Sequence, residues 1–283
     1  LERQLKKQVP AEYFMVTYTL PAELRGLAWA HQKAVYSLLL ECSWATLQTF
    51  SQNDKALQGT PGAISVLHTH SRRLDYHPHV HVVIPAGAID KKKKVWRTKK
   101  SKSGRPFLFS HKALAKVFRI KMQEALTAAG YTLPQHCPSK WVVDCKAVGA
   151  GKKALIYLGR YLYRGVIQEK DIIACKDGKV TFRFQNSKTK RFEYRTVTGE
   201  HFLWLLLRHV LPKGFRRARN FGFLHPNSKR LIQTLHLVLK FAPDIAIPRL
   251  KPRPAMACRC CGGVMNIIKT CIPAFAYAKA GGT

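Results

Sequence analysis

The chain has 283 residues, 46% of them hydrophobic, which is enough for one large packed domain or one domain with an appendage. Its 49 Lys and Arg residues outnumber 15 Asp and Glu residues, so the formal net charge is +34. This charge would oppose folding unless a polyanion is the usual partner, and nucleic acid is the partner we expect. No run of about 18 uncharged apolar residues occurs, which argues against a transmembrane helix and a membrane partner.

The first part of the chain predicts strands and helices in alternation. Strands are indicated by β-branched and aromatic runs, and helices by apolar residues at helical spacing. The strands are predicted over 12–20, 63–70, 79–85 and 141–148. The helices are predicted over 22–52, 111–130 and 152–166. We expect the strands over 63–70 and 79–85 to pair antiparallel as a hairpin with a long loop.

The rest of the chain has shorter elements. Strands are predicted over 172–175, 179–184 and 192–197, and helices over 200–211 and 228–241. The tail from 242 is rich in Pro and small residues and predicts no regular element. We therefore expect a main domain over 1–170, which carries the two candidate sites described below, a basic β/helical DNA-binding extension over 171–245, and an irregular tail over 246–283. The fold class is α+β, an antiparallel sheet with flanking helices.

A histidine cluster in HTHSRRLDYHPHVHVVIP is the first candidate site. Side chains two apart in a strand share a face, so His79 and His81 can bind one metal ion. His68 or His70 on the neighbouring strand would supply a third ligand. A structural zinc site, or exposed histidines without a metal, is the alternative.

A pair of tyrosines in YLGRYLYRG is the second candidate site. Tyr157 and Tyr161 are one helical turn apart, so both phenols can lie on one face. A phenol titrates near a pH of about 10, so nearby cations such as Arg160 and Arg164 would help it to act as a nucleophile. The alternative is that these rings only pack against a sheet.

Two basic runs are candidates for binding a DNA backbone. The first, at 91–105, includes Trp96 as a stacking platform, and the second is KGFRRAR at 213–219. A solvated loop is the alternative for each. The residues expected to contact DNA are Lys91, Lys92, Lys93, Lys94, Trp96, Arg97, Lys146, Arg160, Arg164, Arg216 and Arg217.

The eight cysteines are unevenly spaced and do not predict a disulfide framework, so we expect a cytoplasmic protein, and the positive charge indicates that it is associated with DNA. Cys258 and Cys261, followed by two glycines, are similar to one half of a zinc ribbon. A second pair of ligands is missing, so a structural Zn²⁺ and free thiols both stay open. The chain begins with Leu rather than Met, as expected of a chain that lacks its upstream part.

The histidine cluster and the tyrosine pair together resemble the two-tyrosine, rolling-circle transposases of the insertion sequence ninety-one type. YFMVTYTLPAELR, WVVDCKAV and LRHVLPKGFRRARNFGFL support the resemblance, which covers roughly residues 10–235. It matches His79 and His81 to the paired histidines, Tyr157 and Tyr161 to the nucleophiles, and His68 and His77 to recurrent positions. The sequence departs from the family at His70 and at Leu162-Tyr163.

The resemblance implies a His-hydrophobe-His endonuclease fold of the rolling-circle Rep and relaxase kind. It implies nicking and rejoining of single-stranded DNA, at transposon ends and target, through 5′-phosphotyrosine bonds. Mg²⁺ or Mn²⁺ is the expected metal ion, with substrate phosphate and water completing its shell. Two alternatives stay open: a replication initiator or relaxase, and a non-enzymatic zinc-containing nucleic-acid-binding protein. The sequence says nothing of the oligomeric state.

Overall fold

A computed structural model describes residues 2–90, 93, 95–100, 106–151, 153, 156, 159, 165–186, 189–245, 256–258 and 260–265. The chain forms two compact units, residues 1–245 and 246–283. The boundary expected at residue 170 lies inside the first unit and stays a prediction.

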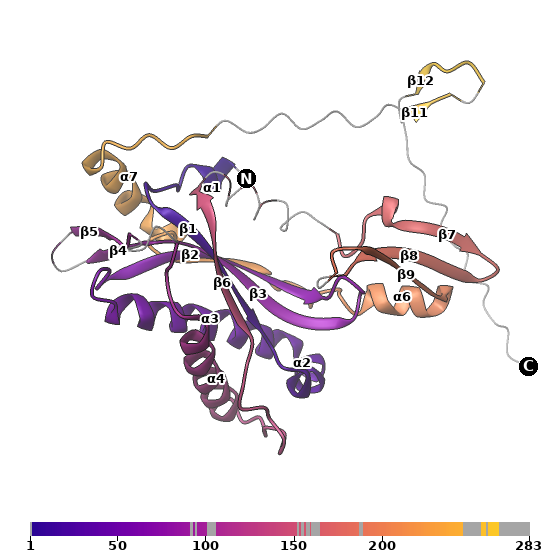
Figure 1. The fold of residues 1–283 in the computed structure, drawn as a ribbon, viewed down its shortest axis with the longest axis horizontal. Helices are drawn as coiled ribbons and strands as arrows, with labels where there is room; N and C mark the ends of the chain where they lie inside the picture. Colours follow the sequence, from indigo (N-terminus) through magenta and orange to yellow (C-terminus); the bar gives the residue numbers. More distant parts are fainter. Residues whose placement is uncertain are drawn as a thin grey trace, which may run out of the picture. The chain divides into compact units, whose positions relative to one another are not determined.

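The first unit is built on an antiparallel sheet with the strand order β5-β4-β2-β3-β1-β6, and β10 also pairs with β2 (Figure 1). Its strands are β1 (Glu12–Thr19), β2 (Thr60–His70), β3 (Tyr76–Pro85), β4 (Gly87–Asp90), β5 (Val95–Thr98), β6 (Val143–Ala150) and β10 (Ala218–Gly222). β3 lies between β2 and β1, so the strand of paired histidines is central, as predicted. The predicted α+β fold, an antiparallel sheet with flanking helices, is confirmed.

The described helices of the first unit flank this sheet and a smaller one. They are α1 (Glu2–Leu5), α2 (Arg25–Ala30), α3 (Gln32–Asn53), α4 (His111–Ala128), α6 (Gly199–Leu207) and α7 (Lys229–Val238), with short 3-10 turns η1 (Ala22–Leu24), η2 (Glu169–Asp171) and η3 (Pro226–Ser228). The single helix predicted over 22–52 was wrong in one respect. The backbone leaves the helical region at His31, with φ −126° and ψ 48°, so α2 and α3 are separate.

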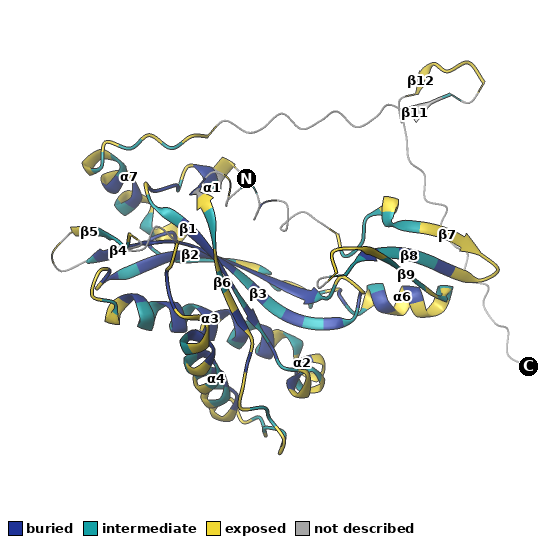
Figure 2. Ribbon diagram, viewed as in Figure 1, coloured by how far each residue is buried: buried dark blue, intermediate teal, exposed yellow. Residues whose placement is uncertain are grey.

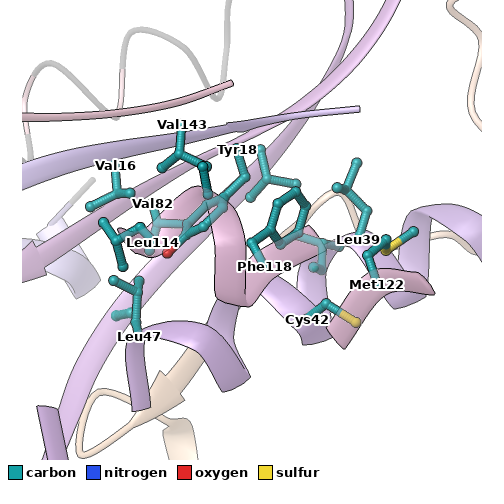
Figure 3. Packing of buried hydrophobic residues seen from close by; sticks show 14 of the residues in the cluster. Val16, Tyr18, Leu39, Cys42, Leu47, Val82, Leu114, Phe118, Met122 and Val143 are labelled. Carbon is teal, nitrogen blue, oxygen red and sulfur yellow. The ribbon is translucent and has the colours of Figure 1, made fainter. Parts of the chain in front are cut away.

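The main core lies between the sheet and helices α3 and α4. Alternate residues of the strands face it, and Figure 3 shows Val16, Tyr18 and Val82 packed against side chains of both helices. The rings of Tyr18 and Phe118 have centroids 4.8 Å apart and are fully buried. Burying a large side chain of this kind stabilises the fold by about 1.5–3 kcal/mol.

The opposite face of the sheet has its own, smaller apolar cluster. Ile64, Val66 and Val83 of the sheet pack there with Leu5 of α1 and Leu235 of α7. The odd-numbered residues of β3 thus point away from α3 and α4, so the histidines at 77, 79 and 81 lie on the other face from the main core. Figure 2 shows these central strands mostly buried.

A second sheet follows, with strands β7 (Ile172–Lys176), β8 (Lys179–Gln185) and β9 (Phe192–Thr198) in sequential antiparallel order. Phe182 of β8 packs on Phe202 of α6, with ring centroids 5.6 Å apart. Leu74, from the loop between β2 and β3, is buried in the same cluster. This second sheet is therefore anchored to the hairpin that carries the histidines.

The second unit has one described hairpin, β11 (Met256–Ala257) and β12 (Val264–Met265). The sequence predicted no regular element there. In the first unit, β10 was also not predicted, because ARNFG lacks an alternating apolar pattern. It forms because the edge of β2 offers unpaired backbone groups.

Candidate metal centre

Three histidines from two adjacent strands converge on one point. His79 and His81 come from β3 and His68 from β2, and their potential ligand nitrogens all lie within 4.8 Å of one another. The ring centroids of His79 and His81 are 4.8 Å apart, and that of His68 lies 5.4 Å and 4.8 Å from them. This trio could hold a metal ion, and within the described residues it is the one such group found.

Strand register explains why His68 joins the pair. His68 is directly opposite His79 in the antiparallel ladder, and directly opposed residues share a face. The register shifts between His68 and His70, so alternation does not carry His70 into the trio. The ring of His70 instead stacks 5.8 Å from that of His68 and lies 5.3 Å from that of His209.

Hydrogen bonds at Nδ1 orient two of the rings. His79 Nδ1 donates to the His77 carbonyl at 2.7 Å, and His81 Nδ1 lies 3.0 Å from Thr17 Oγ1 in a hydrogen bond. Because Nδ1 is engaged in both rings, Nε2 is the nitrogen that would ligate a metal ion. Such second partners commonly fix the tautomer and orientation of metal-binding histidines.

Burial keeps the trio neutral, which is the form that binds metal ions. Desolvation, and then the neighbouring histidines, lower the pKa of His68 to about 2 and that of His81 to about 3. Desolvation also lowers the pKa of His79, against the hydrogen bond to the His77 carbonyl. These donor groups therefore suit a divalent cation at neutral pH.

His77 lies beside the trio without joining it. Its Nδ1 makes a hydrogen bond with Nη2 of Arg25 at 2.8 Å. Desolvation, then His79 and Arg25, lower its pKa to about 4. This pair ties η1 and α2 to the start of β3.

The trio opens into a cavity of about 920 Å³. One wall is the histidine face of the main sheet, and the other comes from β8, β9 and the segment before them. Basic side chains lie around it: Arg72, Arg73, Lys146, Lys170, Arg183 and Arg217. A cavity of this size, rich in cations, can take a phosphodiester with its neighbouring sugars and bases.

Two of these cations were predicted to bind DNA. Lys146 is exposed and lies 3.1 Å from Asp144 in an ion pair. Arg217 is half-buried, and desolvation lowers the pKa of its guanidinium. Arg216, also predicted, is exposed but does not line the cavity.

The wall formed by β8 and β9 was not predicted from the sequence. Alternation in KVTFRFQ puts Arg183 on the face away from buried Phe182. That pattern predicts a strand, but it does not say which neighbour the strand faces. Long-range contacts of the β2–β3 loop with this sheet help to bring Arg183 close to the histidines.

Several predicted site residues lie outside the described residues. They are Tyr157, Tyr161, Arg160, Arg164, Lys91, Lys92 and Lys94. Residues 165–168 line the cavity, and Tyr161 precedes them by four positions in the sequence. The nucleophile assignment therefore stays a prediction.

The first basic run is partly engaged in packing. The Trp96 ring lies edge-on to Phe223, with centroids 5.5 Å apart, and covers Gly87, where an added Cβ would be 2.3 Å from the ring. Arg97 pairs with Asp90 at 3.8 Å. Lys93 is exposed. The packing of Trp96 does not favour a stacking platform there.

Cys258, Cys260 and Cys261 lie in the segment between β11 and β12. The Cys258 amide donates to Gly263 O at 2.8 Å, and Gly262 N–H donates to Cys258 O at 2.9 Å. Backbone N–H groups of Cys261 and then Cys260 lower the pKa of the Cys258 thiol. A structural zinc bound by Cys258 and Cys261 stays a prediction.

Across the described part of the chain, no helix is long and apolar enough to cross a membrane.

Comparison with known proteins identifies the family. The family described as "Putative transposase" (Y2_Tnp) matches residues 62–231 of this chain, which contain the histidine trio. "Putative transposase y4qJ" of Sinorhizobium fredii is 31% identical over 248 residues, covering 79% of this chain and 61% of that protein. The chain thus belongs to this transposase family, and the resemblance seen in the sequence is confirmed.

Other relatives extend the comparison. "Transposase for insertion sequence element IS801" of Pseudomonas savastanoi is 28% identical over 185 residues, covering 58% of this chain and 43% of that protein. The chain spans less than two thirds of either relative. Among solved structures, conjugative relaxase TrwC in complex with mutant oriT DNA has a TM-score of 0.34 and 12% identity, covering 81% of this chain and 74% of that one.

Proposed function

We propose that this protein is a metal-dependent tyrosine endonuclease and strand transferase that moves DNA by nicking and rejoining single strands at transposon ends. The observation that carries the proposal is the neutral histidine trio facing a cation-rich cavity of about 920 Å³, in a chain of a transposase family. A purely structural zinc site would gain nothing from a large cavity lined by basic side chains.

His68, His79 and His81 would hold the metal ion, and Mg²⁺ or Mn²⁺ is the ion we propose. Imidazole suits Mn²⁺ better than Mg²⁺, and phosphate oxygens of the DNA would supply hard ligands for either. The bound ion would withdraw charge from the scissile phosphate. Arg217 and Lys146, on the rim of the cavity, would bind the same phosphate group by charge.

The reaction needs no cofactor other than the metal ion. The hydroxyl of Tyr157 or Tyr161 loses its proton, and its oxygen attacks the phosphorus. The bond from phosphorus to the 3′ oxygen breaks, the 3′ oxygen takes up a proton, and the 5′ phosphate remains joined to the tyrosine. A 3′-hydroxyl of another end then attacks this bond and restores both the phosphodiester and the phenol.

Covalent capture tests the proposal. A labelled single-stranded oligonucleotide carrying a transposon end is incubated with the protein and Mn²⁺, and adducts are resolved on denaturing gels. We expect His79→Ala to abolish the adduct while DNA binding persists, because the basic surface supplies most of the affinity. His201→Ala, a change at an exposed histidine of α6, is the matched control and should leave the adduct unchanged.

The nucleophiles are tested in the same assay. Tyr157→Phe and Tyr161→Phe should each impair strand transfer, and the double variant should form no adduct. Tyr163→Phe should retain activity, since two residues along a helix turn a side chain away from the shared face. Mass spectrometry identifies the linked peptide. A linkage outside Tyr157 and Tyr161, or full activity of His79→Ala, would overturn the proposal.

A further inference from the structure

Two half-exposed tryptophans meet on the surface formed by α2 and α6. Trp29 is 38% exposed and Trp204 is 50% exposed, and their ring centroids are 6.0 Å apart with the planes at 68°. Neither belongs to the histidine cavity. Large aromatic rings at an exposed surface commonly mark a contact with a partner.

An arginine without an acidic partner lies among these rings. The Arg208 guanidinium is 5.6 Å from the Trp29 ring centroid, 5.5 Å from that of Tyr76 and 5.9 Å from that of Trp204. Over the described ranges, no carboxylate forms an ion pair with it, and its Nε is buried without a hydrogen-bond partner. The rings hold the cation in place, and its donors suit an anion.

A second, shallow cavity of about 470 Å³, open to solvent, also has Trp29 in its lining; we call it the aromatic cavity. His31, Lys33, Tyr131 and Pro212 also line it, and the rings of His31 and Tyr131 have centroids 4.8 Å apart. None of its described lining residues is acidic. This combination of aromatic rings and cations is the one that binds single-stranded nucleic acid with little sequence preference.

The basic run KGFRRAR, with Pro212 directly before it, passes between the two cavities. Pro212 lines the aromatic cavity and Arg217 lines the histidine cavity. Five residues of extended chain span at most about 18 Å, so the two cavities are only a few nucleotides apart along this run. The Arg217 carbonyl accepts a hydrogen bond from Leu67 N–H at 2.8 Å, which fixes the run beside β2.

We infer that Trp29, Trp204 and Arg208 form a second DNA site, which binds a nucleotide of the unpaired strand outside the histidine cavity. A base stacks on a tryptophan ring, and Arg208 binds the adjacent phosphate. The inference rests on the proposed function only in that the strand is the one cut at the trio. If a protein is the partner instead, Trp204→Ala should leave the binding of dT unchanged.

The test measures base stacking without cleavage. Binding of an oligo-dT is compared with binding of an abasic oligonucleotide of equal length, in EDTA, by fluorescence anisotropy. Trp204→Ala should weaken dT binding about tenfold while leaving abasic binding within about twofold, because stacking on one ring contributes on this scale. Leu203→Ala is the control, since this neighbour on α6 is 59% exposed but has no ring.

Arg208 is tested through its charge. Arg208→Gln should weaken binding of both oligonucleotides and lower the salt slope by about 0.7, as expected for one lost phosphate contact to a single strand. If Trp204→Ala does not fold, Trp204→Phe replaces it and should give an intermediate loss for dT alone. Equal losses for dT and abasic DNA in the Trp204 variants, or no loss in them, would overturn the inference.

The two proposals can fail separately. If no covalent adduct forms in Mn²⁺, the proposed nuclease activity is refuted, whereas base-dependent binding in EDTA can still be observed. Conversely, if Trp204→Ala leaves the affinity for dT unchanged, the proposed second DNA site is refuted, and the proposal of cleavage at the trio is not affected.

Discussion

Acidification should destabilise the metal-free protein through His68, and the size of the effect follows from its burial. The side chain is only 9% exposed, and burial lowers its pKa from 6.5 to about 2. In the unfolded chain the imidazole of His68 titrates near its ordinary pKa. Below pH 6.5 the unfolded state therefore binds a proton that the folded state does not bind. Stability contributed by this histidine is therefore complete above about pH 6.5 and falls as the pH falls toward 2.

The expected magnitude is about 2.3 kcal/mol between pH 6.5 and 4.5, because the slope rises from half of about 1.36 kcal/mol per pH unit at pH 6.5 to nearly that full value below pH 5.5. Urea unfolding in EDTA, followed by tryptophan fluorescence at each pH, measures the free energy of unfolding. The glutamine side chain of the His68→Gln variant cannot be protonated. Between pH 6.5 and 4.5, the free energy of unfolding of this variant should therefore fall by about that amount less than the free energy of unfolding of wild type. The comparison of slopes does not depend on how stable the variant is at neutral pH.

A control separates this effect from general acid sensitivity. His201→Gln changes an exposed histidine without touching the trio. If wild type and His68→Gln lost stability in parallel between pH 6.5 and 4.5, the ring would not be held neutral by burial, and the argument for a preformed neutral ligand set would fail with it.

Two predictions concern the packing that positions the site. Tyr36→Phe should cost about 1–3 kcal/mol of unfolding free energy in urea, because the buried Tyr76 hydroxyl loses its partner at 2.6 Å; adding Tyr76→Phe should recover part of the loss. Gly87→Ala should cost about 1–3 kcal/mol in the same assay, since the new Cβ would meet the Trp96 ring at 2.3 Å; an unchanged midpoint would mean that this ring moves freely.

The central part of the site was predictable because it is local. Alternation in a strand places His79 and His81 on one face whatever the rest of the fold does, and the antiparallel hairpin brings the preceding strand alongside. The choice of His68 over His70 did not follow from residue spacing, although the family resemblance matched His68 to a recurrent position. It depends on a register shift between these two residues, which no residue type in the sequence marks.

The elements that the sequence did not predict are those that depend on contacts with residues far away in the sequence. The break between α2 and α3 falls at His31, where neither Gly nor Pro signals an end. β10 exists because it pairs with β2, and at Gly222 the backbone has φ +60° and approaches Pro61 closely enough that only glycine fits. Local sequence patterns indicate the type of secondary structure and the position of turns. The helix break at His31 and the strand β10 depend instead on contacts between segments that are far apart in the sequence.

Contacts between residues far apart in the sequence also hold the loop of the histidine hairpin, β2–β3, in place. Leu74, at its loop, has φ +68°, a conformation that costs a non-glycine residue about 1–3 kcal/mol. Its side chain is buried against β8 and α6, and its carbonyl lies 3.0 Å from His209 Nε2 in a hydrogen bond. Arg195 of β9 donates to Asp75 at 2.9 Å. The strain persists because these contacts outweigh it, and they belong to the sheet that forms the far wall of the cavity. These contacts thus hold the loop of the hairpin against the far wall of the cavity, so a change that loosens the second sheet should alter the shape of the cavity.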